Sequence, residues 1–218
     1  MAGFAGCPGA VWADTETSTV ESWNQAEGVV EARKGAGVFV RDFKPIRRRG
    51  IERLAHAQWG AGQPIWSADV AGRELVVDSV EVTEEDASAV IAGVLGLAEG
   101  ARVCVRRRRY TLDGKPVLLA TSYLAADLVT GTPITQPDTG PGGLYARLEE
   151  LGRKPVRFRE EIRSRMPSGD EAERLALPSG VPVVLIARTA FDAQGAAVEV
   201  NDMVLDSAAY VLEYGFEA

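Results

Sequence analysis

The sequence predicts an α+β fold, an antiparallel sheet with short helices, because one strand–helix–hairpin module occurs twice along the chain. Residues 82–117 and 166–198 both follow the order of a strand end, a helix, a Leu-x-Leu-x-x-Gly exit and a hairpin. Five positions carry the same residue in both copies at a constant offset: Leu95, Leu97, Gly100, Val103 and Arg108 match Leu175, Leu177, Gly180, Val183 and Arg188. Two such halves can join their sheets, and the cleft between them is a natural site for a small molecule.

The chain before this domain is weakly patterned over residues 1–26, where residues 19–26 predict about two helical turns. Residues 29–40 alternate around a basic turn that contains Gly35 and Gly37, which predicts a β-hairpin. Prolines, glycines and arginines then predict a linker. We therefore expect a first unit over residues 1–43, a linker over 44–72 and a main domain over 73–218.

The main domain should open with a strand over residues 75–82. Thr83, followed by three acids, has the signature of a helix start, since a hydroxyl caps free amides and acids face the positive end of the helix dipole. That helix is expected to end near Leu95. A hairpin over residues 102–111 and 117–124 follows and turns at Asp113 and Gly114.

The second half of the domain repeats this order. A loop rich in Pro, Gly and Thr fills residues 125–143, and a short helix over 144–151 is stopped by Gly152. A strand over 156–166 precedes Ser168 and Glu171, whose spacing predicts a capping box at the next helix. A second hairpin over 183–191 and 198–205 and a last strand over 210–217 complete the domain.

The composition fits a globular protein that works without a metal or a cofactor. The chain of 218 residues is 46% hydrophobic and carries a net charge of -7, which argues against a nucleic-acid-binding surface over the whole chain. With one histidine, His56, and two cysteines, Cys7 and Cys104, neither a zinc site nor a disulfide framework is expected. The start lacks a signal-peptide pattern and no apolar run has membrane-spanning length, so we expect a cytoplasmic protein without membrane contact.

One short stretch is basic on this acidic chain. Its cationic residues are opposed only by Asp42 and Glu52. They are Arg33, Lys34, Arg41, Lys44, Arg47, Arg48, Arg49 and Arg53. The stretch is either a solvated linker or a contact surface for an acidic partner.

An arginine run inside a strand is the first candidate for binding chemistry. Successive side chains of a strand point to opposite faces, so Arg106, Arg108 and Tyr110 share one face and Arg107 and Arg109 share the other. One of these sets can face the cleft, where a guanidinium fork suits a carboxylate or a phosphate. A solvated, salt-bridged edge strand is the alternative.

The helix start at Gly143 is the second candidate. Gly142 and Gly143 would let an anion approach free helical amides, and Tyr145 follows within the first turn. A plain loop-to-helix turn is the alternative.

Two further pairs of polar residues lie on predicted strands. Arg163 and Arg165 share one face of their strand, as Glu199 and Asn201 share one face of theirs. Polar groups buried in a sheet need partners, so these are either paired structurally or aimed at a ligand. The sequence contains no P-loop, no Gly-x-Ser-x-Gly and no metal-ligand cluster.

In combination, these residues resemble the effector-binding (UTRA) domain of GntR-family transcription regulators of the HutC type. The resemblance covers residues 73–217 and rests on six segments, 95–100, 106–116, 121–124, 142–152, 188–192 and 198–204. It implies a chorismate-lyase-like fold, which agrees with the duplicated module. It also implies effector contacts at Arg108, Gly143, Tyr145 and Glu199. This chain has Tyr110 where the family can use a second arginine and Ala120 at an acidic family position, which weakens an assignment to any particular sugar phosphate.

The resemblance extends to the hairpin, which looks like the wing of the family's winged helix-turn-helix. Glycines at a wing tip allow close approach to DNA, and Arg33, Lys34, Gly35 and Gly37 are the implied DNA-binding residues. Residues 1–22 do not carry the pattern of the helices that precede a wing in the family. We therefore expect the base-reading helix to be missing or altered, and operator binding by this chain to be weak or lost.

The resemblance implies that this chain is the effector-sensing part of a bacterial regulator. It would form a homodimer, bind a small polar and anionic ligand, and control DNA binding allosterically. Two alternatives remain open from the residues alone. One is a chorismate-lyase-like enzyme on the same fold, and the other is a truncated partner that dimerises with full-length regulators.

Overall fold

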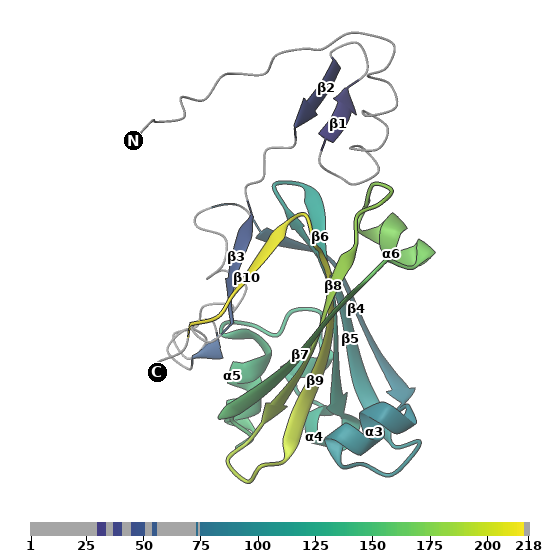
Figure 1. Ribbon diagram of the computed structural model, residues 1–218. Helices are drawn as coiled ribbons and strands as arrows, with labels where there is room; N and C mark the ends of the chain where they lie inside the picture. The colour runs from purple at the N-terminus through teal and green to yellow at the C-terminus, as the bar shows by residue number, and fades with distance from the viewer. Residues whose placement is uncertain are drawn as a thin grey trace.

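The computed structural model describes residues 30–33, 37–40, 45–50, 54–55, 73 and 75–215 (Figure 1). Strands β1 (Val30–Arg33) and β2 (Gly37–Val40) form an antiparallel hairpin, which confirms the hairpin predicted from the sequence. Gly37 pairs with Arg33 at the turn and has a φ of 105°, a conformation that favours glycine. The helical turns predicted over residues 19–26 lie outside the described residues.

A six-stranded antiparallel sheet with the order β4-β5-β6-β9-β8-β7 forms the core of the main domain. Its strands are β4 (Leu75–Asp86), β5 (Arg102–Leu112), β6 (Lys115–Ala125), β7 (Arg157–Arg165), β8 (Val183–Phe191) and β9 (Ala197–Asp206). The order of the second half mirrors that of the first, and the halves meet where β6 pairs with β9. The α+β fold predicted from the duplicated module is thereby confirmed.

Short helices cover both faces of this sheet. They are α3 (Ala89–Leu95), α4 (Ala126–Val129), the 3-10 turn η3 (Pro133–Thr135), α5 (Gly143–Glu150) and α6 (Gly169–Arg174). α4, η3 and α5 pack on the face that carries Cys104, Leu124 and Ala190, which we call the inner face. α3 packs on the opposite, outer face against Val103, Val105 and Val200.

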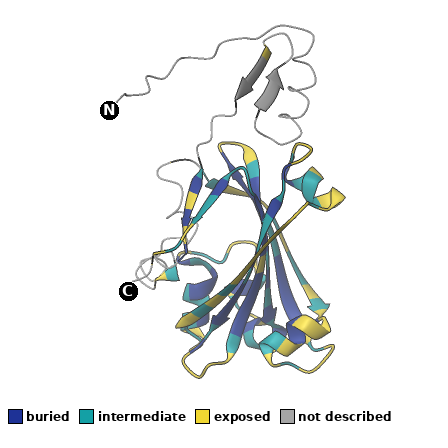
Figure 2. Cartoon of the chain, viewed as in Figure 1, coloured by how far each residue is buried: buried dark blue, intermediate teal, exposed yellow. Residues whose placement is uncertain are grey.

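The equivalent leucines of the two modules lie on the outer face. Leu95 and Leu97 pack with α3, and Leu175 and Leu177 pack against Leu119 and the outer side of β8. Burial is concentrated in the central strands β5, β6, β8 and β9, while the edge strands β4 and β7, the helix surfaces and the turns are more exposed (Figure 2). No helix in the described part of the chain is both long and apolar enough to cross a membrane.

The predicted start of the first helix at Thr83 is wrong. Thr83 and the three acids after it continue β4, and the helix begins instead at Ala89, where the side chain of Ser88 accepts a hydrogen bond from the Ile91 amide at 3.3 Å. The acids pair across the strands, Glu84 and Asp86 with Arg102 and Glu85 with Arg107. These ion pairs and the backbone pairing with β5 hold the segment as a strand, although its local sequence resembles a helix start.

Two other predicted signals, a capping box and a hairpin turn, are confirmed. Ser168 and Glu171 form the predicted capping box at α6. Asp113 and Gly114 have φ values of 50° and 79°, which is the conformation of a two-residue hairpin turn. The loop over residues 125–143 differs from prediction because it contains α4 and η3.

The segment predicted as a linker contains a strand. β3 (Ile46–Arg49) pairs in parallel with β10 (Tyr210–Glu213), which ends earlier than the strand predicted over residues 210–217. Ile46 and Arg48 are buried while Arg47 and Arg49 are exposed. Ile46 belongs to the same apolar cluster as Tyr110, Leu118 and Tyr210. The sequence does not show this alternation of buried and exposed positions, because three consecutive residues of β3 are arginines.

Candidate functional site

The arginine run of β5 divides between the two faces of the sheet as its alternation predicts. On the outer side, Arg107 donates to Glu85 at 2.7 and 2.9 Å and to the Thr83 hydroxyl at 3.1 Å. Arg109 donates to Asp78 at 2.8–3.1 Å. Both outer arginines therefore have carboxylate partners within the fold.

Arg106 lies on the inner face and holds a loop against the sheet. Its side chain is buried and donates to the carbonyl oxygens of Ile134, Gln136 and Pro137. Burial and the nearby charge of Arg108 lower the pKa of this guanidinium. Arg106 thus fixes the η3 loop over the inner face.

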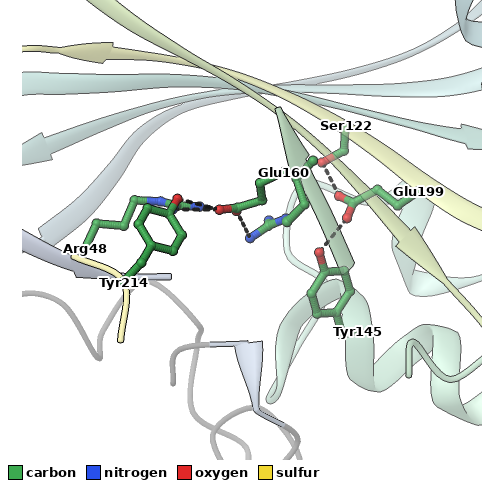
Figure 3. Close-up of polar contacts among 7 residues, drawn as sticks. Arg48, Ser122, Tyr145, Glu160, Glu199 and Tyr214 are labelled. Atoms are coloured by element: carbon green, nitrogen blue, oxygen red, sulfur yellow. Dashed lines mark hydrogen bonds and ion pairs between the residues drawn. The ribbon is translucent and has the colours of Figure 1, made fainter. Parts of the chain in front are cut away.

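Arg108 begins a chain of hydrogen bonds on the inner face, and Figure 3 shows the part of it that joins Ser122, Glu199 and Tyr145. Arg108 Nη2 donates to Ser122 Oγ at 2.5 Å, Ser122 Oγ donates to Glu199 Oε1 at 2.6 Å, and Tyr145 Oη donates to Glu199 Oε2 at 2.7 Å. Ser122, Glu199 and Tyr145 are 0%, 2% and 2% exposed, whereas Arg108 is only partly buried. Burial, together with the Glu199 carboxylate, raises the pKa of Tyr145 well above its ordinary value, so this hydroxyl stays protonated and donates.

Arg108 Nε and Asn201 Oδ1 are among the polar atoms of this cluster that lack a hydrogen-bond partner in the described part of the chain. Asn201 is 1% exposed and pairs in register with Ser122 on one side and Arg188 on the other. Buried polar atoms are costly to leave unpaired, so both atoms are suited to a ligand.

Arg188 extends the cluster onto β8. It is 2% exposed, its guanidinium lies 5.6 Å from the centre of the Tyr145 ring, and its Nη1 lies 4.0 Å from Glu160 Oε1. Burial opposes its charge, but Tyr145, Glu199 and Glu160 together raise the pKa of Arg188. The duplicated module makes Arg188 the counterpart of Arg108, so each half of the sheet supplies an arginine at the equivalent inner-face position.

The charges of this inner-face cluster do not balance. Among the described residues, Arg106, Arg108 and Arg188 face Glu199, while Glu160 is engaged by Arg48. An excess of buried or half-buried positive charge is unfavourable unless a counter-charge is supplied. The cluster is therefore complementary to an anion.

The structure brings together Arg108, Tyr145, Glu199 and Asn201 of the predicted site residues. Tyr110 shares their face but packs in the apolar cluster with Leu118 and Leu205. The predicted amide donor at Gly143 is already engaged, since this N–H donates to the Gly140 carbonyl at 3.1 Å.

The structure does not bring Arg163 and Arg165 to the cluster, and their role as effector contacts stays a prediction. Glu160 pairs with Arg188 in the β7–β8 register, so Glu160, like Phe158 two residues earlier, lies on the inner face. The odd-numbered residues of β7, which include Arg163 and Arg165, therefore lie on the outer face. Both arginines are exposed, and Arg165 donates to Glu171 of the capping box at 2.6 and 2.7 Å.

Ser122, Glu160 and Arg188 are cluster residues that the sequence analysis missed. The repeat gives a signal for Arg188, because Arg108 was already a candidate at the equivalent place. Ser122 and Glu160 have no such signal, since their roles depend on cross-strand register. Of the implied DNA-binding residues, Arg33 and Gly37 belong to the β1–β2 hairpin, and Lys34 and Gly35 lie outside the described residues.

No group of three or more histidine, cysteine, aspartate or glutamate side chains that could hold a metal ion occurs among the described residues. The chemistry that the cluster offers is recognition: guanidinium donors, a tyrosine hydroxyl, an amide and one carboxylate.

Comparison with known proteins places this site in a family. A family model of the UTRA domain matches residues 70–210. An uncharacterized HTH-type transcriptional regulator of Streptomyces coelicolor is 34% identical over 203 residues, which cover 88% of this chain and 75% of the relative. The HTH-type transcriptional repressor PhnF of Mycolicibacterium smegmatis is 33% identical over 129 residues, 59% of this chain and 50% of the repressor.

Solved structures agree. The crystal structure of PhnF matches with a TM-score of 0.62 and 27% identity, covering 93% of this chain and 84% of that chain. A GntR-family transcriptional regulator from Bacillus cereus has the same fold, with a TM-score of 0.58 at 16% identity over 67% of this chain and all of that chain.

Residues 70–210 thus form a UTRA domain, and the curated relatives are transcriptional regulators rather than enzymes. The chain belongs to the GntR family of transcriptional regulators that carry a UTRA effector-binding domain.

Proposed function

We propose that the inner-face cluster binds a small polar effector that is anionic on one side, and that its occupancy controls DNA binding by the regulator. The observation that carries this proposal is Arg108. Its hydrogen bond goes to a neutral side chain, Ser122, whereas Arg107 and Arg109 have carboxylate partners and Arg106 is held by three loop carbonyls. Among the described residues its Nε has no acceptor, and Ser122 links it to the buried Ser122–Glu199–Tyr145 chain.

The chemistry of the cluster defines the effector class. Arg108 and Arg188 supply cationic donors for a carboxylate or a phosphate. Glu199 and Asn201 supply acceptors for a hydroxyl or an amine. An effector with an acidic group at one end and a hydroxyl or amine at the other meets both sides of the cluster.

Native mass spectrometry of the purified protein tests for a retained small molecule. Calorimetry with that molecule should then show that Arg108→Ala weakens binding by roughly 2–4 kcal/mol, about thirtyfold to nearly a thousandfold, because a desolvated anion loses its main partner. Arg107→Ala is the matched control, since it removes the same charge from the next residue on the outer face. If Arg107→Ala weakens binding more than Arg108→Ala, the ligand lies on the outer face and the proposal is wrong.

The proposed control of DNA binding is based on the relatives, which are HTH-type transcriptional regulators. In this proposal the β1–β2 hairpin serves as a wing, the regulator works as a homodimer, and the effector shifts an equilibrium between states that differ in operator affinity. A bound effector must then change the affinity of the full-length regulator for DNA. Equal DNA affinity with and without saturating effector would sink this part.

A further inference from the structure

Arg48 is a fully buried arginine that comes from outside the effector domain. It lies on β3, whereas the family model matches residues 70–210. Its side chain is 0% exposed and makes a two-armed contact with Glu160 of β7: Nη1 lies 2.9 Å from Oε2, and Nη2 contacts Oε1. Such a group is stable only because its charge is paired.

A second residue outside the matched range completes this contact. Tyr214, just after β10, donates to Glu160 Oε2 at 3.1 Å and accepts from Arg48 Nη1 at 3.3 Å. Its ring covers Gly50 so closely that a Cβ on Gly50 would overlap it, with Tyr214 Cδ1 at 2.7 Å. β3, Gly50 and Tyr214 therefore form one unit around the Arg48–Glu160 pair.

Glu160 also faces the effector site. Its Oε1 lies 4.0 Å from Nη1 of Arg188, and Arg188 is in turn influenced by Glu199 and Tyr145 (Figure 3). Burial favours a neutral acid, but the hydrogen bond and charge of Arg48 and the charge of Arg188 keep the pKa of Glu160 below its ordinary value. One carboxylate is thus shared between the strand that follows the hairpin and the inner-face cluster.

We propose that Arg48 and Glu160 are positioning residues that couple effector occupancy to the docking of β3 on β10. This inference rests on the proposed function, since it assumes an anion bound near Arg188. It adds a residue from the interdomain segment to the regulation of the site.

The sign of the coupling follows from the charges. When Arg48 is docked, it neutralises Glu160, so this carboxylate does not repel an anion bound near Arg188. When β3 undocks, Arg48 no longer neutralises Glu160. The charge of Glu160 then repels the anion and competes with it for Arg188. Docking therefore strengthens anion binding, and by reciprocity a bound anion strengthens docking.

The position of β3 makes this docking relevant to regulation. The hairpin ends at Val40 and β3 begins at Ile46, so release or docking of β3 changes the tether of the hairpin. The Ile46 amide donates to the Ala209 carbonyl at 2.7 Å and the Gly50 amide donates to the Glu213 carbonyl at 3.0 Å. These two amides report directly on whether β3 is docked.

Hydrogen exchange of the whole chain tests the ligand-free contact. Arg48→Met should speed exchange over residues 46–50 by about a hundredfold, because it leaves Glu160 without its main partner. Arg47→Met is the matched control, as Arg47 lies on the same strand with a side chain that is 59% exposed, and it should change exchange little.

Gly50→Ala is a second variant that keeps Arg48 but displaces the Tyr214 ring, and it should also speed exchange at the amides of residues 46–50. Unchanged exchange in both Arg48→Met and Gly50→Ala overturns the proposal.

Inorganic phosphate, added in a titration, tests the coupling itself. In the wild type it should slow exchange both over residues 143–150 and, by about fivefold or more, over residues 46–50. In Glu160→Gln it should still slow residues 143–150 but no longer residues 46–50, which a purely structural role for Glu160 would not produce. Slowing of residues 143–150 alone in the wild type overturns the coupling and leaves the proposed function intact. If neither segment responds while Arg48→Met still loses protection, the coupling is overturned because the anion site has failed.

Discussion

Four consecutive arginines in β5 have three kinds of environment, because a strand alternates and its neighbours differ. Arg107 and Arg109 meet carboxylates on β4, and Arg106 meets backbone carbonyls of the η3 loop. Arg108 meets a serine that is itself committed to Glu199. Identical side chains thus divide into sheet stabilisers, a loop anchor and a ligand-binding candidate, according to what lies opposite each one.

Tyr145 tests the buried hydrogen-bond chain. Tyr145→Phe removes one donor from a Glu199 carboxylate that is 2% exposed, so it should destabilise the domain by about 1–3 kcal/mol. Chemical denaturation of wild type and variant measures this difference. Tyr123→Phe, on the outer face of β6, is the matched control and should cost less. Equal costs for the two tyrosines would contradict a special role for the Tyr145 hydroxyl.

At this scale the sequence predicts faces better than partners. Strand alternation correctly places Arg108 opposite Arg107, and Glu199 with Asn201. It cannot reveal that Ser122 bridges Arg108 and Glu199, because that contact depends on the register of three strands. Arg163 and Arg165 share a face with each other, as predicted, but that face is not the one that carries Glu199.

At the scale of elements, cross-strand partners decide where local signals conflict. The acids after Thr83 resemble a helix start, but Arg102 and Arg107 on β5 hold them in β4. Ser168 and Glu171 have no such competitor, and their capping box forms as predicted. β3 was missed for a similar reason: its partner, β10, lies more than 150 residues further along the chain, and nothing local announces a parallel pair.

The capping box of α6 predicts a pH dependence of stability. Glu171 of this box accepts hydrogen bonds from the Arg165 side chain and from the Ser168 amide, and these bonds lower the pKa of Glu171 to about 2. A carboxylate whose pKa is lowered by folding stabilises the folded state above its unfolded pKa, about 4.3, and loses this contribution as the pH falls toward about 2. Because Arg165 is 44% exposed, the contribution is screened to about 1 kcal/mol.

Glu171→Gln should therefore lower the melting temperature at neutral pH, and the difference from wild type should shrink as the pH is lowered from about 5 to about 3. Thermal denaturation followed by circular dichroism measures both quantities. Glu173→Gln, an exposed change on the same helix, is the control and should have little effect at either pH. A Glu171→Gln difference that grows on acidification would contradict the assigned ion pair.

At the scale of the whole molecule, duplication explains both the sheet and the site. Two copies of one module meet at β6 and β9, so equivalent arginines approach a shared centre from the two halves. The sequence predicts this architecture well because the repeat is long and regular. It does not predict how β3 and β10 close against Glu160, since these strands lie outside both modules.

Among the residues that the structure describes, the mirrored sheet ends in two edge strands, β4 and β7. On β4, Val76 and Val77 are 41% and 42% exposed, and exposed edges of this kind favour association with another chain. We expect the protein to be a homodimer, because a two-fold pair covers such surfaces in a closed assembly. Multi-angle light scattering at micromolar concentration should give twice the 23.3 kDa mass of the chain. A mass equal to one chain would contradict this expectation.

DNA binding by this chain is expected to be weak and governed by charge. The net charge of -7 repels a polyanion overall, so attraction must come from the local basic stretch that begins with Arg33 and Lys34. If these two side chains neutralise one phosphate each, affinity should fall about twelvefold between roughly 50 and 200 mM salt, because bound counterions are released. Fluorescence anisotropy with duplexes of unrelated sequence should give similar affinities, since phosphate contacts carry no sequence information.

Replacing both Arg33 and Lys34 by alanine should flatten the salt dependence of DNA binding, whereas Arg174→Ala, which removes a charge from α6, should leave it unchanged. A protected footprint on one defined sequence at physiological salt would show instead that this chain reads bases, and the wing would then act with a base-reading element of the same protein.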